Sequence, residues 1–121
     1  MFWMGDLNFR LELDRKNIEE ALKKKDYRTL LRYDQLFNER NLRNCFDLFQ
    51  EGNITFEPTY RYERGSRQYS LEKMREPAYC DRILWKSVFK DRVKLLEYNS
   101  TDKLMTSDHS PVYAIFEVKV C

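Results

Sequence analysis

The sequence predicts an α+β fold in one small domain, and three observations support this prediction. Apolar and polar residues alternate near the N-terminus, which is typical of an extended segment. Residues 15–43 instead gather their apolar residues on one face of a helix. Three β-like runs follow in the last third of the chain. The order strand, helices, strands favours a mostly antiparallel sheet.

The composition is that of a globular protein. Of the 121 residues, 42% are hydrophobic, 35% charged and 15% aromatic, which is enough for a core and too aromatic for a disordered tail. No run approaches the roughly 20 apolar residues that span a bilayer, so we expect no transmembrane segment. The apolar residues 1–4 are followed at once by Gly5 and Asp6, which argues against a secretory signal.

Charge and cysteine content narrow the class of protein. The chain has 22 Lys and Arg against 20 Asp and Glu, a net charge of +2, whereas a dedicated nucleic-acid binder is far more basic. We therefore expect no nucleic-acid partner. The three cysteines, Cys45, Cys80 and Cys121, lack C-x-x-C spacing, which favours free thiols over a zinc site or a disulfide framework. Free thiols fit a cytoplasmic protein.

The first half of the chain is predicted to contain a strand and three helices. A strand over 2–4 is followed by a tight Gly-Asp feature and by an alternating strand or extended segment over 7–13. Asn17 with Glu20 three residues later resembles a capping box at the start of the first helix. Asp26 and Asp34 are expected to cap two further short helices. The lysine run 23–25 is more typical of a solvated helix end than of a binding site.

The second half is predicted to be rich in strands and loops. A short strand over 54–56 should end before Pro58. Residues 61–76 form a polar excursion that contains Gly65 and five basic residues. Strands are then expected over 80–87, 92–99 and, after Pro111, over 112–120.

Two polar residues near the first strand could carry chemistry. If the segment is extended, Asp6 and Asn8 point the same way, because side chains alternate along a strand. A carboxylate beside an amide suits the activation of water and the stabilisation of a developing oxyanion. The alternative is a turn aspartate followed by a turn asparagine.

A second candidate group lies in the C-terminal third. Asp108 and His109 are adjacent in a loop that precedes a strand, a common place for a catalytic histidine, although a lone histidine is also often a hydrogen-bonded structural residue. Asp81 enters an otherwise apolar strand and needs a partner, either a neighbour of Arg82 or the ring N–H of His109. A structural ion pair is the alternative for Asp81.

Taken together, these residues resemble the parts of a metal-assisted hydrolase. Such a site needs hard oxygen ligands, a base and a histidine held by a carboxylate. The residues that could supply them are Asp6, Asn8, Asp81, Asp108 and His109. The basic excursion 61–76 could contact phosphate groups, or it could be a solvated loop, since acidic residues interrupt it.

The order and wording of five segments resemble the inositol polyphosphate 5-phosphatases. Residues 2–10, Phe-Trp-Met-Gly-Asp-Leu-Asn-Phe-Arg, resemble the first signature of that family, and residues 76–84, Glu-Pro-Ala-Tyr-Cys-Asp-Arg-Ile-Leu, resemble the second. Segments 34–36, 54–62 and 105–112 also resemble the family, in the expected order, so the resemblance covers 2–118. The wording of 54–62 and 105–112 is most similar to the branch that acts on phosphatidylinositol 3,4,5-trisphosphate.

This resemblance implies a DNase-I-like β-sandwich flanked by helices that works with Mg²⁺. It implies that Asp6 orients and deprotonates the attacking water and that Asn8 contacts the scissile phosphate. His109 would stabilise the phosphoryl oxygens, Asp81 would orient His109, and Asp108 would lie near the metal ion. In-line attack on a phosphomonoester needs this kind of positioning and charge neutralisation more than covalent catalysis.

The resemblance also implies a substrate-binding loop. Tyr60, Arg61, Lys73 and Arg75 would hold the phosphate next to the scissile one on an inositol phosphate or a phosphoinositide headgroup. The chain departs from the common family residues at three positions, with Phe9 for Tyr, Tyr79 for Trp and Arg61 for Lys. Arginine in place of lysine alters the geometry of a phosphate contact.

The main departure from the family is length, because the first signature normally lies midway through a catalytic domain of roughly twice this size or more. We therefore expect residues 1–121 to be the C-terminal half of such a domain, without the upstream glutamate and asparagine that bind Mg²⁺. Alone, such a chain should be weakly active or inactive.

Two alternative functions remain open. One is a non-catalytic module that binds phosphoinositides or interacts with the other half of a domain, and the other is a nuclease of the same superfamily. Any membrane contact should be peripheral recruitment to the membrane surface.

Overall fold

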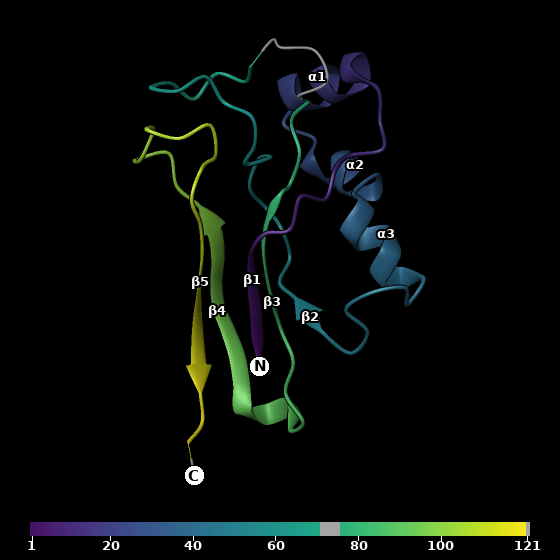
Figure 1. Cartoon of the computed structure of the whole chain (residues 1–121). Helices are drawn as coiled ribbons and strands as arrows, with labels where there is room; N and C mark the ends of the chain where they lie inside the picture. Colours follow the sequence, from purple (N-terminus) through teal and green to yellow (C-terminus); the bar gives the residue numbers. More distant parts are fainter. Residues whose placement is uncertain (71–75, 121) are drawn as a thin grey trace.

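The computed structural model describes residues 1–70 and 76–120 of the chain (Figure 1). Along this part of the chain the elements are β1 (Phe2–Asp6), α1 (Arg15–Lys23), α2 (Tyr27–Arg32), α3 (Gln35–Asn41), β2 (Gln50–Glu51), β3 (Asp81–Trp85), a 3₁₀ turn η1 (Lys90–Arg92), β4 (Val93–Ser100) and β5 (Val112–Val118). The mixed content and the order of elements confirm the α+β prediction.

The described strands form two antiparallel sheets. One has the order β1-β3-β2 and the other is the hairpin β4-β5. The helices lie beside the three-stranded sheet, and the hairpin lies on its other side (Figure 1). The strands predicted over 80–87, 92–99 and 112–120 are therefore confirmed, and so is the antiparallel pairing; β3 and β5 are shorter than expected, and β4 is shifted by one residue.

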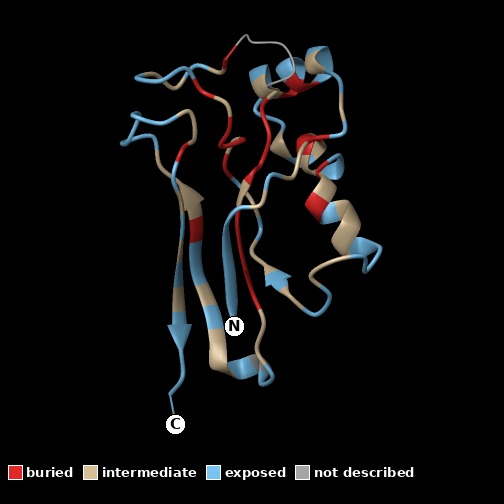
Figure 2. Ribbon diagram, viewed as in Figure 1, coloured by how far each residue is buried: buried red, intermediate tan, exposed pale blue. Residues whose placement is uncertain are grey.

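Strand β3 is the centre of the structure because its sequence is apolar on both faces. Ile83, Leu84 and Trp85 are all buried, as expected of a strand with a neighbour on each side. Strand β1 is its opposite: all five of its residues are exposed, including Phe2 and Trp3. Figure 2 shows this contrast between the buried β3 and the exposed β1.

No strand forms at two positions where the sequence offered one. Residues 54–56 form no strand, because Phe56 is buried as a core residue and its carbonyl accepts a hydrogen bond from the Tyr79 hydroxyl at 2.8 Å instead of joining a ladder. Residues 7–13 form no strand either, and Leu11 makes one isolated bridge to Asp34. The backbone at Asn8 has φ 57°, which interrupts the extended path.

The helix starts are partly as predicted. Asp26 and Asp34 cap α2 and α3 by accepting hydrogen bonds from the backbone N–H groups of Thr29 at 3.2 Å and Phe37 at 2.9 Å. The expected capping box at Asn17 is wrong, because α1 begins at Arg15 and Asp14 occupies the N-cap position. Lysines 23–25 are exposed at the end of α1, as predicted.

The core joins the helices to β3. Its buried cluster contains Ile18, Leu30, Phe56, Tyr79 and Ile83, with smaller neighbours around them. Cys45 and Cys80 are free thiols, as predicted, and burial raises the pKa of Cys80 to about 12. Among the described residues, no helix has both the length and the apolar character needed to cross a bilayer.

A charged network is buried at the edge of this core. Arg82 is 1% exposed, and its guanidinium donates to both carboxylate oxygens of Asp34 at 2.8 Å and to both of Glu51 at 2.7 Å. The hydroxyl of Tyr98 donates to Glu51 at 2.8 Å. The network joins β3 to β2 and to the N-cap of α3, so it fixes the strand on which Asp81 is carried.

Candidate active site

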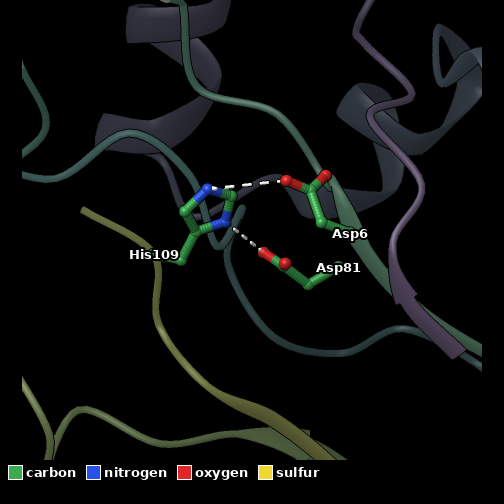
Figure 3. Close-up of side chains that lie close together, drawn as sticks. All are labelled: Asp6, Asp81 and His109. Atoms are coloured by element: carbon green, nitrogen blue, oxygen red, sulfur yellow. Dashed lines mark hydrogen bonds and ion pairs between the residues drawn. The ribbon is translucent and has the colours of Figure 1, made fainter. Parts of the chain in front are cut away.

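The candidate site forms where three segments meet at one end of β1 and β3. Asp6 is the last residue of β1, Asp81 is the first residue of β3, and the antiparallel register places them opposite each other. His109 arrives from the loop before β5, where it forms a β-bridge with Tyr60. Asp6, Asp81 and His109, which are far apart in sequence, therefore lie together, as Figure 3 shows.

His109 is held by Asp81 through a short hydrogen bond. Its Nδ1 atom lies 2.7 Å from Oδ2 of Asp81, and the Thr59 hydroxyl donates to the same oxygen at 2.9 Å. The hydrogen bond to Asp81 raises the pKa of His109, and the nearby carboxylates of Asp6 and Asp108 raise it further, while partial burial works in the opposite direction. The ring is therefore poised to carry a proton on Nε2.

The second ring nitrogen of His109, Nε2, points toward Asp6. The distance from His109 Nε2 to Asp6 Oδ2 is 3.8 Å, too long for a direct hydrogen bond and short enough for a shared ligand or water. The Asp6 side chain is 51% exposed. Its other oxygen, Oδ1, accepts a hydrogen bond at 3.0 Å from the backbone N–H of Asn8.

Asn8 lies beside Asp6 in a turn, which was the alternative to an extended segment. Alternation along an extended segment was expected to align the two side chains, but β1 ends at Asp6 and Asn8 adopts the left-handed conformation. The Asn8 side-chain oxygen accepts a hydrogen bond from Arg10 at 2.6 Å. Asparagine tolerates a positive φ better than most residues, so the sequence suits this turn.

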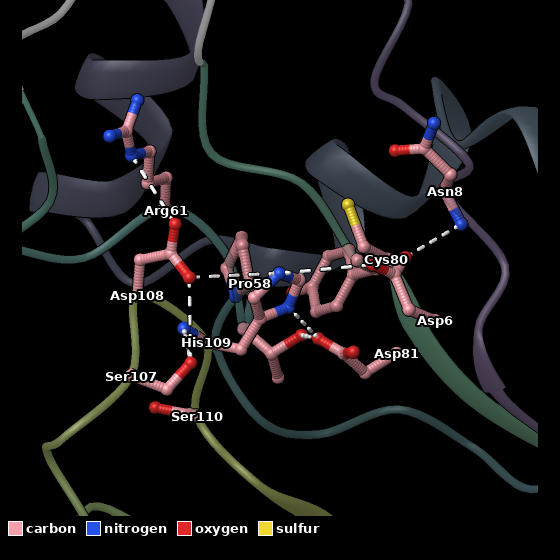
Figure 4. A network of polar contacts seen from close by, with 12 residues as sticks. Asp6, Asn8, Pro58, Arg61, Cys80, Asp81, Ser107, Asp108, His109 and Ser110 are labelled. Atoms are coloured by element: carbon pink, nitrogen blue, oxygen red, sulfur yellow. Dashed lines mark hydrogen bonds and ion pairs between the residues drawn. The ribbon is translucent and has the colours of Figure 1, made fainter.

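Asp108 and Arg61 lie beyond His109 as seen from Asp6 (Figure 4), and the Tyr60 ring lies against the His109 ring. Asp108 lies between His109 and Arg61, with Oδ1 at 4.0 Å from Nε2 of His109 and Oδ2 at 3.5 Å from Nε of Arg61. The Tyr60 and His109 rings are 4.7 Å apart, and the Arg10 guanidinium lies 4.8 Å from the Tyr60 ring centre. Tyr60 and Arg61 are thus placed next to the cluster, whereas the predicted contacts Lys73 and Arg75 lie outside the described residues.

Sequence reasoning missed a clamp on the histidine loop. Arg67 donates to the Ser110 hydroxyl at 2.6 Å and to the Ser107 carbonyl at 3.3 Å, on either side of His109. Its guanidinium also lies 4.3 Å from the ring centre of Tyr62. No local pattern could have found this contact, because Arg67 and Ser110 are 43 residues apart.

The donor set fits part of a magnesium site. One ligand atom each from Asp6, Asp81 and His109 lies within 4.8 Å of the others. Mg²⁺ prefers oxygen ligands and is held by one or two carboxylates together with water and substrate phosphates. Asp6 offers an accessible carboxylate, while Asp81 is occupied by His109 and Thr59. An ion at this cluster would therefore lie near the carboxylates of Asp6 and Asp108 and take its other ligands from water and phosphate.

The helix-flanked antiparallel sheets, with a carboxylate–histidine cluster at the strand ends, match the DNase-I-like fold of inositol 5-phosphatase domains. The chain belongs to endonuclease/exonuclease/phosphatase family 2, whose family model matches residues 1–115. A solved structure of the inositol polyphosphate 5-phosphatase domain of SPsynaptojanin, in complex with inositol (1,4)-bisphosphate and calcium ion, matches with a TM-score of 0.85 and 32% identity, over 97% of this chain and 35% of that chain.

The curated relatives indicate the same branch as the sequence motifs. The chain is 46% identical to phosphatidylinositol 3,4,5-trisphosphate 5-phosphatase 2 of Homo sapiens and to the 2B protein of Danio rerio, over 99% of its own length. It spans 10% of the length of each of these relatives.

The same fold also occurs in a protein with another kind of ligand. The structure of a Cimex nitrophorin ferrous NO complex matches with a TM-score of 0.89 and 32% identity, over 98% of this chain and 41% of that chain. An argument about activity must therefore come from the site and not from the fold.

Proposed function

We propose that the chain carries the water-activating and phosphoryl-binding residues of a Mg²⁺-dependent phosphatase that removes the 5-phosphate of inositol polyphosphates or phosphoinositides. The observation that carries this proposal is the 2.7 Å bond between Asp81 and His109, which directs Nε2 toward Asp6 across a gap of 3.8 Å. The similarity to proteins named as phosphatidylinositol 3,4,5-trisphosphate 5-phosphatases supports the substrate class.

In this proposal Asp6 is the general base. Its Oδ2 oxygen is exposed and accepts a proton from the attacking water, while the Asn8 N–H bond to Oδ1 keeps the carboxylate in one orientation. The Asn8 side chain, held by Arg10, contacts the scissile phosphate. The bound divalent ion supplies charge neutralisation of the phosphate.

His109 stabilises the phosphoryl oxygens in the transition state. Because Asp81 and the neighbouring carboxylates raise its pKa, the ring can be an imidazolium that donates from Nε2. Asp81 acts as the positioning residue that accepts from Nδ1 and fixes the ring orientation. Preorganised donors of this kind lower the barrier because they need not reorient during the reaction.

The adjacent loop is proposed to bind the neighbouring phosphate. Arg61 and Tyr60 lie next to His109, and Lys73 and Arg75 complete the set by sequence resemblance. Arg61 is partly neutralised by Asp108 at 3.5 Å, so a phosphate would compete with this carboxylate for the guanidinium. Asp108 would then be free to turn toward a metal ion.

We further propose that residues 1–121 act as part of a larger catalytic domain. The chain covers 35% of the matched 5-phosphatase domain structure, and strand β1 exposes Phe2, Trp3 and Met4, which further strands of such a domain would cover. On this proposal the isolated chain has little or no turnover, and membrane contact is peripheral.

Phosphate release tests both proposals. The chain, alone and within the longest natural polypeptide that contains it, is assayed on inositol 1,4,5-trisphosphate and on short-chain phosphatidylinositol 3,4,5-trisphosphate with Mg²⁺ and after chelation. Asp6→Asn should reduce turnover of the longer polypeptide by about 10²–10⁴-fold, the usual contribution of a general base. Turnover that survives Asp6→Asn or chelation would contradict the mechanism, and full turnover by residues 1–121 would contradict the partial-domain proposal.

A further inference from the structure

A cleft outside the candidate active site carries an unbalanced positive charge. It lies between α2 and α3 on one side and residues 51–55 on the other, with a volume of about 860 Å³. This is the size range of small-molecule sites, roughly 300–1,000 Å³. Figure 1 shows that α2, α3 and β2 lie on the same side of the molecule.

Three exposed cations line this cleft. Lys25 precedes α2, and Arg28 and Arg32 are four residues apart on it, so they share one face of the helix. Within the part of the chain that the structure describes, none of these three side chains forms an ion pair or hydrogen bond. Like charges at this spacing repel each other, so an anion between them would relieve the repulsion.

The two carboxylates of the cleft offset only part of this charge. Asp26 caps α2, with one oxygen accepting from the Thr29 N–H at 3.2 Å and the other from the Thr29 hydroxyl at 2.7 Å. The hydrogen bonds from the Thr29 hydroxyl and N–H lower the pKa of Asp26, and the nearby charge of Arg32 contributes to this shift. Glu51 is almost fully buried and is paired with Arg82 and Tyr98. Asp26 is thus the one exposed carboxylate of the cleft lining, against the three exposed cations.

The cleft also offers apolar surface and one further guanidinium. Leu31, Phe37 and Ile54 line it, and Phe37 is 45% exposed. Arg40, on α3, is 22% exposed and lies 3.8 Å from Glu51, so it faces the cleft near its floor. Arginine side chains suit phosphate because their planar fork donates two parallel hydrogen bonds.

We propose that this cleft is a second, non-catalytic site for a phosphate-bearing polyanion. It is distinct from the catalytic cluster, since none of Asp6, Asp81 and His109 lines it. Arg82 reaches its floor from β3, where successive side chains point to opposite faces, so Asp81 points away from it. The site would bind either a soluble polyphosphate or a lipid headgroup, because both present the same phosphate groups. This inference does not depend on the catalytic proposal.

Calorimetric titration of the full chain tests the proposal, with a chelator present to remove metal-dependent binding. The probes are tripolyphosphate, inositol hexakisphosphate and phosphatidylcholine vesicles that contain a phosphoinositide. We expect saturable binding of at least one probe, weakened about tenfold or more by Arg28→Gln/Arg32→Gln, because glutamine removes the charge-assisted hydrogen bonds that each guanidinium would donate to phosphate. Which probe binds identifies the source of the phosphate.

The matched control is Lys16→Gln/Lys23→Gln, which removes the same charge from exposed positions of α1 outside the cleft. It should leave the affinity nearly unchanged, and Arg28→Lys/Arg32→Lys should retain part of it. Glutamine and arginine have similar helix propensities, so the variants should fold, which thermal unfolding verifies. Absence of saturable binding for all three probes would overturn the proposal, and so would equal losses of affinity in the two glutamine double variants. NMR spectra recorded with the bound probe give a further check. Changes in amide chemical shift confined to the surroundings of Asp6 and His109 would also overturn the proposal.

Discussion

Arg67 donates a hydrogen bond of 2.6 Å to the hydroxyl of Ser110, the residue that follows His109. The second terminal nitrogen of Arg67 reaches the carbonyl of Ser107 at 3.3 Å. The loop that carries the candidate phosphoryl-binding histidine is therefore fastened from both sides by a side chain of the basic excursion. A residue in this position can affect the reaction without touching the substrate.

Replacing Arg67 should loosen this loop. Arg67→Ala removes both hydrogen bonds and the contact with the Tyr62 ring, and we expect a loss of about 1–3 kcal/mol in the free energy of unfolding, measured by urea denaturation. Arg67→Lys keeps the positive charge but lacks the planar guanidinium that donates two hydrogen bonds, so its stability should lie between those of the original chain and Arg67→Ala. Arg64→Ala is the control, because Arg64 is exposed, and an equal loss there would contradict the clamp.

Asp81→Asn should lower the pKa of His109. The Asp81 carboxylate accepts from Nδ1 and stabilises the imidazolium, so an amide in its place favours the neutral ring. Titration of the His109 ring resonances by NMR in metal-free buffer measures the change. An unchanged or higher pKa would show that Asp81 is not the main cause of the shift.

The same shift makes stability depend on pH. Because the pKa of His109 is raised in the folded state, its contribution to stability is complete below the unfolded value of about 6.5 and is lost as the pH rises through the folded value. The free energy of unfolding should therefore fall above that pH. His109→Gln should remove this part of the pH dependence, and a curve that keeps the same shape would contradict the assignment.

The buried network around Arg82 should be costly to break. Arg82→Met leaves the carboxylates of Asp34 and Glu51 buried without their partner, and removal of one member of a buried pair typically costs about 3–5 kcal/mol. Urea denaturation at neutral pH measures the loss. Arg28→Met, at an exposed position, should change stability by less than about 0.5 kcal/mol, and similar values for both variants would refute the distinction.

A side chain at Gly52 is predicted to displace the side chain of Leu95. A Cβ atom there would lie 2.2 Å from Cδ2 of Leu95 and 3.1 Å from the Tyr98 ring. Gly52→Ala should therefore destabilise by about 1–3 kcal/mol through overpacking. The double variant Gly52→Ala/Leu95→Ala tests the cause, since removing the Leu95 side chain should make the glycine substitution much less harmful. Additive losses would contradict the steric explanation.

Elements with strong local signals could be predicted from the sequence. The caps at Asp26 and Asp34 depend on contacts three residues away, and the apolar run of β3 shows directly that it is buried on both faces. The strand predicted over 54–56 was wrong because a short apolar run can be either a strand or a buried loop. Here Phe56 is a core residue, and its carbonyl accepts a hydrogen bond from the Tyr79 side chain. Periodicity cannot separate these two cases.

The residues of the candidate site that belong to sequence motifs could be predicted. Asp6, Asp81 and His109 do converge, and the possible Asp81–His109 contact is present. The turn at Asn8 agrees with the alternative that the sequence left open, a turn asparagine after a turn aspartate, and local sequence could not decide between this turn and an extended segment. The clamp by Arg67 was not predictable, because it joins residues 43 apart.

Strand β1 has a further consequence for handling this protein. It lies at the edge of its sheet, pairs only with β3 among the described strands, and all five of its residues are exposed. An apolar strand with an open edge is a template for another strand. In concentrated solution the chain should therefore self-associate edge to edge, and a polypeptide that pairs with β1 should keep it monodisperse.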